Sequence, residues 1–528
     1  MSNSTARTSS ILDFEAAAKL LKLEAYGDWY RDPWSWFELE PEVVKKMDME
    51  ADLGFARRVK ASGNGFGFDV SPSFHLLTIP KSFTGVRPGV VIDPASKLVY
   101  TAAASQIATR MHGGLSEWVY GWRLRDGEAT VTTDERKLYE DSVSNIRGSR
   151  WALQTDITSF FASTDIDNLM DDIRSIIGRT AATDAVDQVL RAHMQLPERQ
   201  GLPQRCYASS YLANLAVAPV DDVIGGALSN GRISSARRWM DDISVEAEDL
   251  AELYRLIVEI QAAMRRAGLE INTSKTHLTS GKKSHTLLKK DSPDKIELQT
   301  LLLMNSYTDE IEDAGIDLAP LAHAEEHLLR NPRGINRGEG AMVLRALRKY
   351  EKTDRYLEWR KIAHQLPHLA DSLGRYFASA IDSNGRARAA LERWFVVFER
   401  SPWASLEWVS TQYAMAFSST NLPPSIGTIL HGWLKSSHSL QQVSLAAQRL
   451  SIVDPKLARA TISARSSHEM DPQVQRALAL GLAAAGGGQR DVRELLARSK
   501  HNRLTTKALE LRGWRPPKDS HDVDPVTG

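Results

Sequence analysis

Two adjacent carboxylates, Asp241 and Asp242, lie between an apolar pair at 239–240 and the apolar run 243–245. This pattern predicts a strand, a tight turn and a second strand, with the acids at the turn. Side chains alternate between the faces of a strand, so adjacent acids reach one cation only where the backbone turns. Like charges this close destabilise each other unless a divalent cation compensates them. The pair is either a metal site or a solvated turn, and taken alone the turn is the better interpretation because Asp is a common turn residue.

A third carboxylate, Asp156, lies in the apolar, β-leaning run 151–161. A helix is expected after it, capped by Ser163 or Thr164, with one apolar face formed by Ile166, Leu169, Ile173 and Ile176. A lone acid near a strand end is usually a cap or turn residue. Together with a second acid site, however, it supplies what two-metal phosphoryl transfer requires. One cation lowers the pKa of the attacking hydroxyl and the other holds the triphosphate and leaving group.

The sequence also predicts the secondary structure between and after these acids. Residues 201–215 predict a loop followed by a helix. Residues 247–266 predict an amphipathic helix that ends at Gly268, because its apolar residues recur at alternating spacings of three and four. A further strand is expected over residues 269–276.

In this order, the segments resemble the palm of a reverse transcriptase. The resemblance covers about residues 70–310, and five short motifs in the expected order make coincidence unlikely. It implies an α+β fold with the fingers and palm of a right-hand polymerase. The motifs are Asp156 with Phe160–Phe161, Gly201-Leu202-Pro203-Gln204, Met240-Asp241-Asp242, Gly268-Leu269 with Asn272 and Lys275-Thr276, and, resembling the fingers of bacterial members, Ile79-Pro80-Lys81-Ser82-Phe83-Thr84-Gly85-Val86-Arg87-Pro88.

The resemblance implies roles for the acids and the aromatic pair. Asp156 and Asp241 would be the principal ligands of two Mg2+ ions, with Mn2+ as an alternative, and Asp242 would support them. Phe161 falls at the position of the steric gate that excludes a ribose 2′-hydroxyl, which implies the use of deoxynucleotides. Phe160 is the better choice for a core aromatic.

It also implies nucleotide contacts. Lys81 and Arg87 resemble the fingers cations that hold the triphosphate, where Arg offers bidentate contacts. Without the motifs downstream they would be interpreted as solvated loop cations. Gln204 would line the nucleotide pocket. Lys275 would donate a proton to departing pyrophosphate, or else be an ordinary surface lysine after a helix.

Two residues depart from the family pattern. Arg205 follows Gln204 where the family usually has glycine, which permits close backbone approach. Trp239 replaces the usual tyrosine or phenylalanine at the floor of the primer terminus. Neither change removes a metal ligand, and both fall where template and primer would lie. We therefore expect ordinary chemistry, with template copying less secure than catalysis.

Composition sets the wider limits. A chain of 528 residues with 42% hydrophobic and 25% charged residues is a globular protein of two or three domains. It has no run of about eighteen apolar residues, so no membrane span is expected. The polar N-terminus lacks a signal core, which favours the cytoplasm. The single cysteine, Cys206, excludes an internal disulfide and a cysteine-cluster zinc site, and packing is its expected role.

The 66 basic and 66 acidic residues balance, so positive charge for nucleic acid must be local. Candidates are Lys282, Lys283, Lys289 and Lys290, and the basic stretch 330–361, whose alternative is a solvated helix face. Neutrality favours a short or self-made product over a long duplex.

Beyond residue 310 the periodicity becomes helical, with no clear strand. The predicted organisation is a helical N-terminal extension over 1–70, fingers and palm over 71–310, an all-α thumb or repeat-like domain over 311–515 and a disordered tail over 516–528. The predicted helices are 321–329, 340–350, 356–366, 389–398, 441–450, 457–464, 474–485 and 491–499.

A palm followed directly by helices is most similar to bacterial abortive-infection and defence-associated reverse transcriptases. A ribonuclease H domain is not visible, and the single cysteine excludes a Cys/His endonuclease module. This resemblance implies antiphage defence, deoxynucleoside triphosphates as substrates, a DNA product, and a homo-oligomer or a complex with another defence protein. It also implies priming from a protein hydroxyl, for which Tyr350, Tyr356, Tyr376 and Tyr413 are candidates, with an unconventional template or none.

Two alternatives remain. One is a reverse transcriptase that copies a dedicated non-coding RNA. The other is a catalytically silent scaffold whose helical domain binds a partner. Retention of the three acids, Lys81, Arg87 and Gln204 argues against the scaffold.

Overall fold

The computed structural model describes residues 12–25, 27–60, 63–125, 128–129, 132–144, 149–280 and 317–517. The chain forms two compact units. The sheet unit comprises residues 1–28, 39–74 and 92–290, and the helical unit comprises residues 29–38, 75–91 and 291–528.

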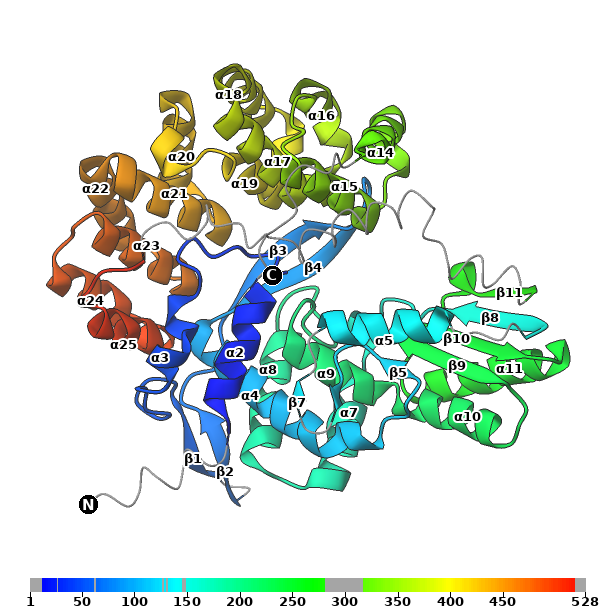
Figure 1. Cartoon of the computed structure of the whole chain (residues 1–528). Helices are drawn as coiled ribbons and strands as arrows, with labels where there is room; N and C mark the ends of the chain where they lie inside the picture. The colour runs from blue at the N-terminus through cyan, green and yellow to red at the C-terminus, as the bar shows by residue number, and fades with distance from the viewer. Residues whose placement is uncertain are drawn as a thin grey trace, which may run out of the picture. The chain divides into compact units, whose positions relative to one another are not determined.

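A five-stranded sheet lies within the sheet unit. Its strand order is β11–β8–β10–β9–β5, antiparallel except for the β5–β9 pair (Figure 1). The middle strand β10 is buried at every position after Asp242, as expected for a strand covered on both faces. The strands are β5 (Val119–Tyr120), β8 (Trp151–Thr155), β9 (Ser235–Trp239), β10 (Asp242–Ala247) and β11 (His277–Ser280).

Helices cover this sheet and extend the unit. Helix α11 (Leu250–Arg266) packs on β8 and β10, α10 (Ala218–Ser229) packs on β9, and α5 (Thr132–Ser144) packs on β5 and β9. The long helix α4 (Pro94–Met111) is buried along most of its length among α2 (Phe14–Ala25), α8 (Ala181–Met194) and α9 (Tyr207–Ala216). A small hairpin joins β6 (Leu124–Arg125) to β7 (Glu128–Ala129).

The predicted N-terminal extension is not purely helical. Besides α2 and α3 (Pro41–Val44), it contains the antiparallel hairpin β1–β2 (Phe55–Lys60 and Gly63–Phe68). Side chains of α8 hold the β2 backbone, because Asp184 accepts from the Phe66 amide at 2.9 Å and Gln188 from the Phe68 amide at 3.2 Å. The β1–β2 hairpin of the extension therefore packs against α8 within the sheet unit, and α8 side chains bond backbone amides of β2.

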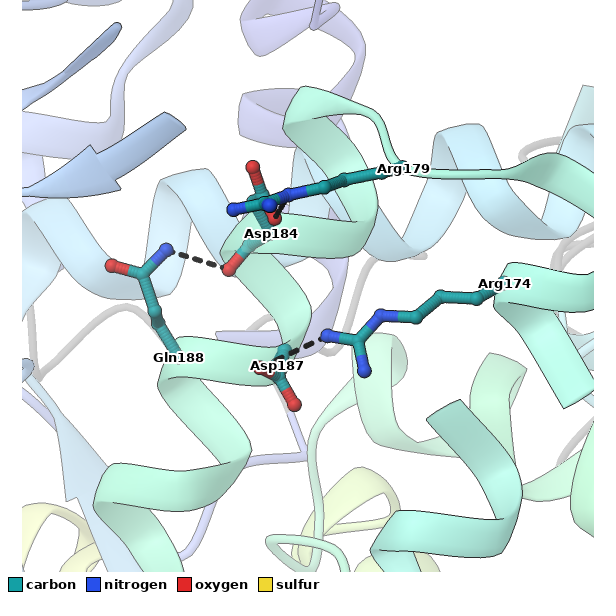
Figure 2. A pocket seen from close by; sticks show the side chains of 5 residues that line it. All are labelled: Arg174, Arg179, Asp184, Asp187 and Gln188. Atoms are coloured by element: carbon teal, nitrogen blue, oxygen red, sulfur yellow. Dashed lines mark hydrogen bonds and ion pairs between the residues drawn. The ribbon is translucent and has the colours of Figure 1, made fainter. Parts of the chain in front are cut away.

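A pocket of 360 Å³ lies where α8 faces α7 (Ile166–Ile177), and Figure 2 shows its lining side chains. Its two arginines are both neutralised: Arg179 bonds Asp184 at 3.0 Å and Arg174 bonds Asp187 at 3.0 Å. The charges balance within the pocket, so it serves as part of the packing between α7, α8 and the β1–β2 hairpin.

Two local predictions are corrected. Helix α7 is capped by Asp165, whose Oδ1 accepts from the Asn168 amide at 3.1 Å, and not by Ser163 or Thr164. Ile176 is 67% exposed, and Met170 takes its place on the buried face. Aspartate is a stronger cap than Thr. At about 100° per residue, Met170 lies roughly 40° from Ile166 around the helix, whereas Ile176 lies roughly 80° away on its edge.

The segment after α11 also differs from expectation. Gly268 ends the helix with φ +73°, as predicted. The strand expected over 269–276 is instead a single bridge between Ile157 and Ile271, followed by the 3₁₀ turn η3 (Thr273–Lys275). The regular strand, β11, begins only at His277. The turn has a consequence for the site, because it aims Asn272 and Lys275 at the end of β8.

Within residues 317–517 every regular element is a helix, so the all-α prediction is confirmed there. The helices stack as successive pairs in two rows (Figure 1). One row is α15, α17, α19, α21, α23 and the other is α14, α16, α18, α20, α22, α24. Their bounds are α14 (Ala319–Arg330), α15 (Arg337–Lys349), α16 (Tyr356–Ile362), α17 (Ala370–Ser383), α18 (Gly385–Glu399), α19 (Glu407–Ala414), α20 (Pro424–Ser436), α21 (Leu440–Val453), α22 (Pro455–Ser466), α23 (Pro472–Ala484), α24 (Gln489–Ala497) and α25 (Arg503–Leu511).

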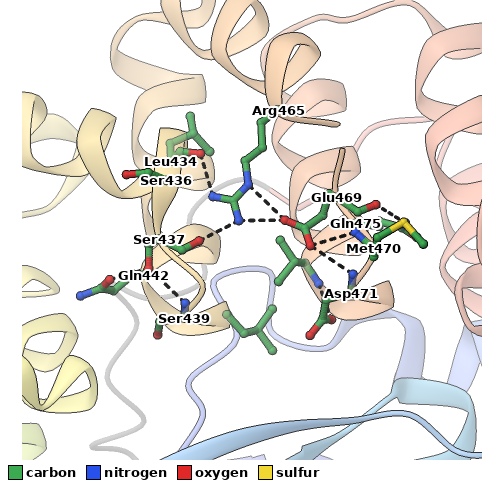
Figure 3. A network of polar contacts seen from close by, with 12 residues as sticks. Leu434, Ser436, Ser437, Ser439, Gln442, Arg465, Glu469, Met470, Asp471 and Gln475 are labelled. Carbon is green, nitrogen blue, oxygen red and sulfur yellow. Dashed lines mark hydrogen bonds and ion pairs between the residues drawn. The ribbon is translucent and has the colours of Figure 1, made fainter. Parts of the chain in front are cut away.

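Polar contacts repeat along this stack. Trp359 donates to Glu325, 34 residues earlier, and Trp433 donates to Glu399, also 34 residues earlier. Arg465 on α22 donates to the carbonyls of Leu434 at 2.9 Å and Ser437 at 2.7 Å at the end of α20 (Figure 3). The last carbonyls of a helix lack partners within it, so an arginine from the next pair caps them. The unit is an irregular helical-repeat stack.

The helical unit includes two segments from the N-terminal half of the chain. One is residues 29–38, where Asp32 and Glu38 form buried ion pairs with Arg476 at 2.9 Å and 2.5 Å. The other is most of the hairpin β3–β4 (Phe74–Pro80 and Val86–Ile92). The units therefore differ from the predicted domains, which placed both segments with other parts of the chain. The C-terminal tail from residue 518 and the lysines at 282–290 lie outside the described residues.

No single helix among the described residues is long and apolar enough to cross a membrane. Only the bent pair α9 and α10 meets that test together, by length and composition.

Candidate active site

The turn between β9 and β10 presents the acid pair. Trp239 pairs with Asp242, so Met240 and Asp241 form a two-residue loop, as the pattern predicts. Met240 has φ +56°. A positive φ at the first loop position is the requirement of the hairpin turns that match strand twist, and it costs a non-glycine residue energy. The loop places Asp241 at the tip and Asp242 at the start of β10.

Asp156 lies directly beside this turn. It follows the last residue of β8, and the pairing of Thr155 with Ile243 puts it next to Asp242. The residue is 6% exposed. Its carboxylate accepts hydrogen bonds from Asn272 Nδ2 at 3.0 Å and from Lys275 Nζ at 2.9 Å. The structure thus brings together Asp156, Asp242 and Lys275, three of the predicted site residues.

Asn272 belongs to one of the sequence motifs, but the resemblance implies no role for it. Its side chain and its backbone both bind Asp156, since the Asn272 amide donates to the Asp156 carbonyl at 2.7 Å. The signal in the sequence was its spacing of three residues from Lys275, which in a single 3₁₀ turn places both side chains on one side. Only the fold shows that this side faces Asp156.

The negative charges of the three acids repel one another. Asp242 has solvent access, yet surrounding protein atoms and the charges of Asp241 and Asp156 raise its pKa to about 7. Lys275 opposes this rise. Burial lowers the pKa of Lys275, but its hydrogen bond to Asp156 and the charge of Asp156 outweigh that effect and hold the pKa above its ordinary value. The raised pKa of Asp242 and the ammonium group of Lys275 therefore both reduce the negative charge that a bound divalent cation would otherwise neutralise.

The donor set suits a hard divalent cation, because Mg2+ prefers carboxylate oxygens. The raised pKa of Asp242 indicates negative charge in excess of what the protein neutralises. Among the described residues, however, no group of three or more acids, histidines and cysteines stands ready to hold a metal. The residues fit the cation in type and charge, and in this structure Lys275 bonds Oδ1 of Asp156.

Phe160 takes the core position that is predicted for it. Phe160 is 3% exposed, whereas Phe161 is half-buried. The Phe161 carbonyl accepts from the Leu202 amide at 2.8 Å. Gly201, with φ +61°, packs so closely that an added Cβ would overlap the Phe161 carbonyl oxygen. The Gly-Leu-Pro loop therefore supports the backbone of the steric-gate candidate.

Arg205 has a positive φ, which is the conformation that usually requires glycine. Gln204 is half-buried, and Arg205 is exposed with φ +61°. The conformation that favours glycine is thus retained at a position where the side chain is a long cation. Cys206 beside it is buried, and burial raises the pKa of its thiol to about 12, which confirms packing as its role.

Trp239 lies in an aromatic cage within the sheet unit. Its ring meets Trp122 at 6.1 Å and Tyr139 at 5.5 Å, and the Arg136 guanidinium lies over it at 5.5 Å. A Cβ on Gly121 would lie 3.2 Å from the ring. Two side chains of α5 therefore pack on Trp239, which stays half-buried.

The remaining predicted residues, Lys81 and Arg87, belong to the other unit. Both are exposed near the tip of the β3–β4 hairpin. Their roles, like those of all the other predicted site residues, stay predictions.

Residues 79–298 match the family described as reverse transcriptase (RNA-dependent DNA polymerase). The chain contains a reverse transcriptase domain. This agrees with the α+β fold, the acid turn and the following helical region, and it places the domain in the class of RNA-directed DNA polymerases.

Among solved structures, the chain is similar to telomerase from Candida albicans in complex with a fragment of telomeric RNA. The identity is 12% over 65% of this chain and 66% of that chain, just under two thirds of its length, with a TM-score of 0.30. No curated protein matches the chain.

Proposed function

We propose that this protein is an Mg2+-dependent DNA polymerase that adds deoxynucleotides to a growing strand, in antiphage defence. The observation that supports this most directly is the carboxylate of Asp156 beside the Asp241–Asp242 turn within a reverse transcriptase domain. The defence role rests on the resemblance to bacterial abortive-infection enzymes. Assembly as a homo-oligomer, or with another defence protein, is proposed on the same ground.

The reaction joins a nucleotide to a hydroxyl. The hydroxyl oxygen attacks the α-phosphorus, an O–P bond forms, the bond to pyrophosphate breaks and the hydroxyl proton leaves. Bound Mg2+ would lower the pKa of the hydroxyl and stabilise the charge on the leaving group. Asp156 and Asp241 would hold the ions with support from Asp242, and Lys81 and Arg87 would bind the triphosphate. Lys275 would protonate the departing pyrophosphate.

The test is incorporation of labelled deoxynucleotides by the purified protein in Mg2+. Asp241→Asn and Asp156→Asn should abolish incorporation, because each removes a negative metal ligand while keeping the side-chain shape. Asp222→Asn, an exposed acid on α10, is the matched control and should match wild type. Equal background labelling of wild type and Asp241→Asn would reject the polymerase and favour the silent scaffold.

A template requirement is a separate question. The left-handed backbone at Arg205 and the α5 side chains packed on Trp239 support synthesis with an unconventional template or none. Sequencing nucleic acid that co-purifies with the protein, and repeating incorporation after ribonuclease treatment, distinguishes this from copying a dedicated non-coding RNA. Loss of synthesis after ribonuclease, with a product complementary to one RNA, would establish the RNA-templated alternative.

Protein priming requires an accessible hydroxyl. Of the four tyrosines predicted as candidates, Tyr356, Tyr376 and Tyr413 are at most 9% exposed. Tyr350, half-buried at the end of α15, is the best remaining candidate. If it primes, label should stay with the protein after nuclease trimming and be lost in Tyr350→Phe. Tyr254→Phe, on the 65% exposed Tyr254, is the control.

A further inference from the structure

The tip of the β3–β4 hairpin is a closed loop that carries an aromatic side chain. The Lys81 amide donates to the Gly85 carbonyl at 2.7 Å, and the Gly85 amide donates to Ser82 Oγ at 3.0 Å. Phe83 lies between them, half-buried, two residues from Lys81 and four from Arg87. The closed loop therefore links the backbone at Phe83 to that of Lys81, and its last residue leads into the strand that carries Arg87.

Phe83 packs against the first helical repeats. Its ring lies 6.0 Å from that of Trp403 in η7 (Pro402–Ser405), and the guanidinium of Arg333 in η4 (Pro332–Gly334) lies over it at 5.5 Å. His364 in turn packs on Trp403 at 5.3 Å. Aromatic and cation–π contacts of this kind are stabilising, so together they hold Phe83 against the repeats.

The other end of the hairpin is anchored to later repeats. His75 at the start of β3 bonds Asp471 at 2.9 Å through Nδ1 and accepts from the Leu440 amide at 3.0 Å through Nε2. Gln473 on α23 donates to the Val91 carbonyl in β4 at 2.9 Å. The hairpin is thus fixed at both ends by the helical unit, at its base by polar bonds and at its tip by one aromatic side chain.

We propose that Phe83, Trp403 and Arg333 form a positioning anchor through which the helical repeats set the geometry of the triphosphate-binding cations. Together they are the tip anchor, and its role rests on the proposed function of Lys81 and Arg87. The loop at 81–85 is short, so without the anchor the segment that carries Lys81 and leads into Arg87 at the start of β4 would sample more conformations. Fixing them before the nucleotide arrives reduces the entropy lost on binding.

The kinetic test uses Phe83→Ala and Trp403→Ala. Both should raise the KM for deoxynucleotide by about tenfold, with little change in kcat or Mg2+ dependence, because the anchor acts on binding and not on the acids. Trp403→Phe keeps a ring and should restore most of the affinity. Trp514→Ala is the control, because Trp514 makes the same type of contact with Arg493 at 4.9 Å, within the same unit but away from the hairpin.

A second readout does not depend on activity. Amide hydrogen exchange at residues 81–87 should accelerate in Phe83→Ala and Trp403→Ala and stay at the wild-type rate in Trp514→Ala. Folded Trp403→Ala protein with unchanged exchange and unchanged KM overturns the anchor. If wild type incorporates no nucleotide, the proposed function fails instead, and exchange at 81–87 still decides whether the tip is anchored. A loss of nucleic-acid binding with unchanged KM also overturns the proposal.

Discussion

Lys275 donates a hydrogen bond to Asp156 at 2.9 Å, so a lysine neutralises the most buried acid of the site. The ammonium group bonds Oδ1, and Asn272 bonds Oδ2. Residues 272–275, at η3, therefore hold both carboxylate oxygens by hydrogen bonds. If the site binds Mg2+ as proposed, Lys275 would compete with the ion for Asp156 as well as being the candidate proton donor.

Lys275→Ala should separate these two effects. Removing the competing ammonium should tighten Mg2+ binding, while loss of the proton donor should lower kcat by about a hundredfold. The measurement is incorporation rate against Mg2+ concentration. Lys275→Arg keeps the charge and should leave the Mg2+ requirement near that of wild type. A kcat unchanged in Lys275→Ala would show that the residue is a surface lysine with no catalytic part.

Mg2+ binding should depend on pH near neutrality. The pKa of Asp242 is raised to about 7, so below that pH the carboxyl holds a proton that a cation must displace. Affinity should rise by up to about tenfold per pH unit up to about pH 7 and level off above it. Calorimetric Mg2+ titrations at several pH values check this. In Asp242→Asn the proton release over this range should disappear, and a pH-independent affinity in wild type would contradict the assignment.

The same shift has a consequence for the metal-free protein. The pKa of Asp242 is higher when folded than the 3.8 of an ordinary aspartate, so the folded state binds more protons between pH 3.8 and about 7. Stability from this group is present at the acid end of that window and is lost as pH rises through it. Thermal melts in a chelator should show this trend, and it should vanish in Asp242→Asn.

Arg205→Gly should stabilise the fold and change the product. A non-glycine residue at φ +61° carries about 1–2 kcal/mol of strain, which glycine relieves at a smaller cost in chain entropy. Chemical denaturation should show a gain, and Arg205→Ala, which keeps the Cβ, should not. If Arg205 replaces a template contact, product sequence should change more than total incorporation. An unchanged product would leave Arg205 as a packing or phosphate-contact residue.

Gly201→Ala should damage sugar discrimination. The new Cβ would overlap the Phe161 carbonyl, and φ +61° adds backbone strain, so the gate candidate must move. We expect a loss of more than about 2 kcal/mol in stability and a lower preference for deoxynucleotides over ribonucleotides. Gly231→Ala is the matched control, because Gly231 has φ +68° with nothing within 4 Å and so reports the backbone strain alone. Equal effects of the two changes would show that the contact with Phe161 does not matter.

Local sequence patterns predict much of the secondary structure around the site. The strand–turn–strand at Asp241–Asp242, the strand before Asp156 and the glycine that ends α11 follow from local patterns, because each depends on neighbouring residues alone. Within residues 317–517, the helices at 370–383, 407–414, 424–436 and 503–511 have no counterpart among the predicted ones. Helix α19 is buried on nearly all sides, so it has no polar face to mark a helical period.

The amino-acid sequence by itself determined the acids, the order of the motifs and the all-α character of the C-terminal region, since these depend on residue type and short-range spacing. Only the tertiary structure decided which side chains meet. Asn272 and Lys275 reach Asp156 because a 3₁₀ turn replaces the expected strand, and α5 packs on Trp239 across 100 residues of chain. The hairpin of Lys81 and Arg87 joins the helical repeats through Phe83, His75 and Val91. Contacts between distant segments are selected by the packing of the whole unit, and no local pattern records them.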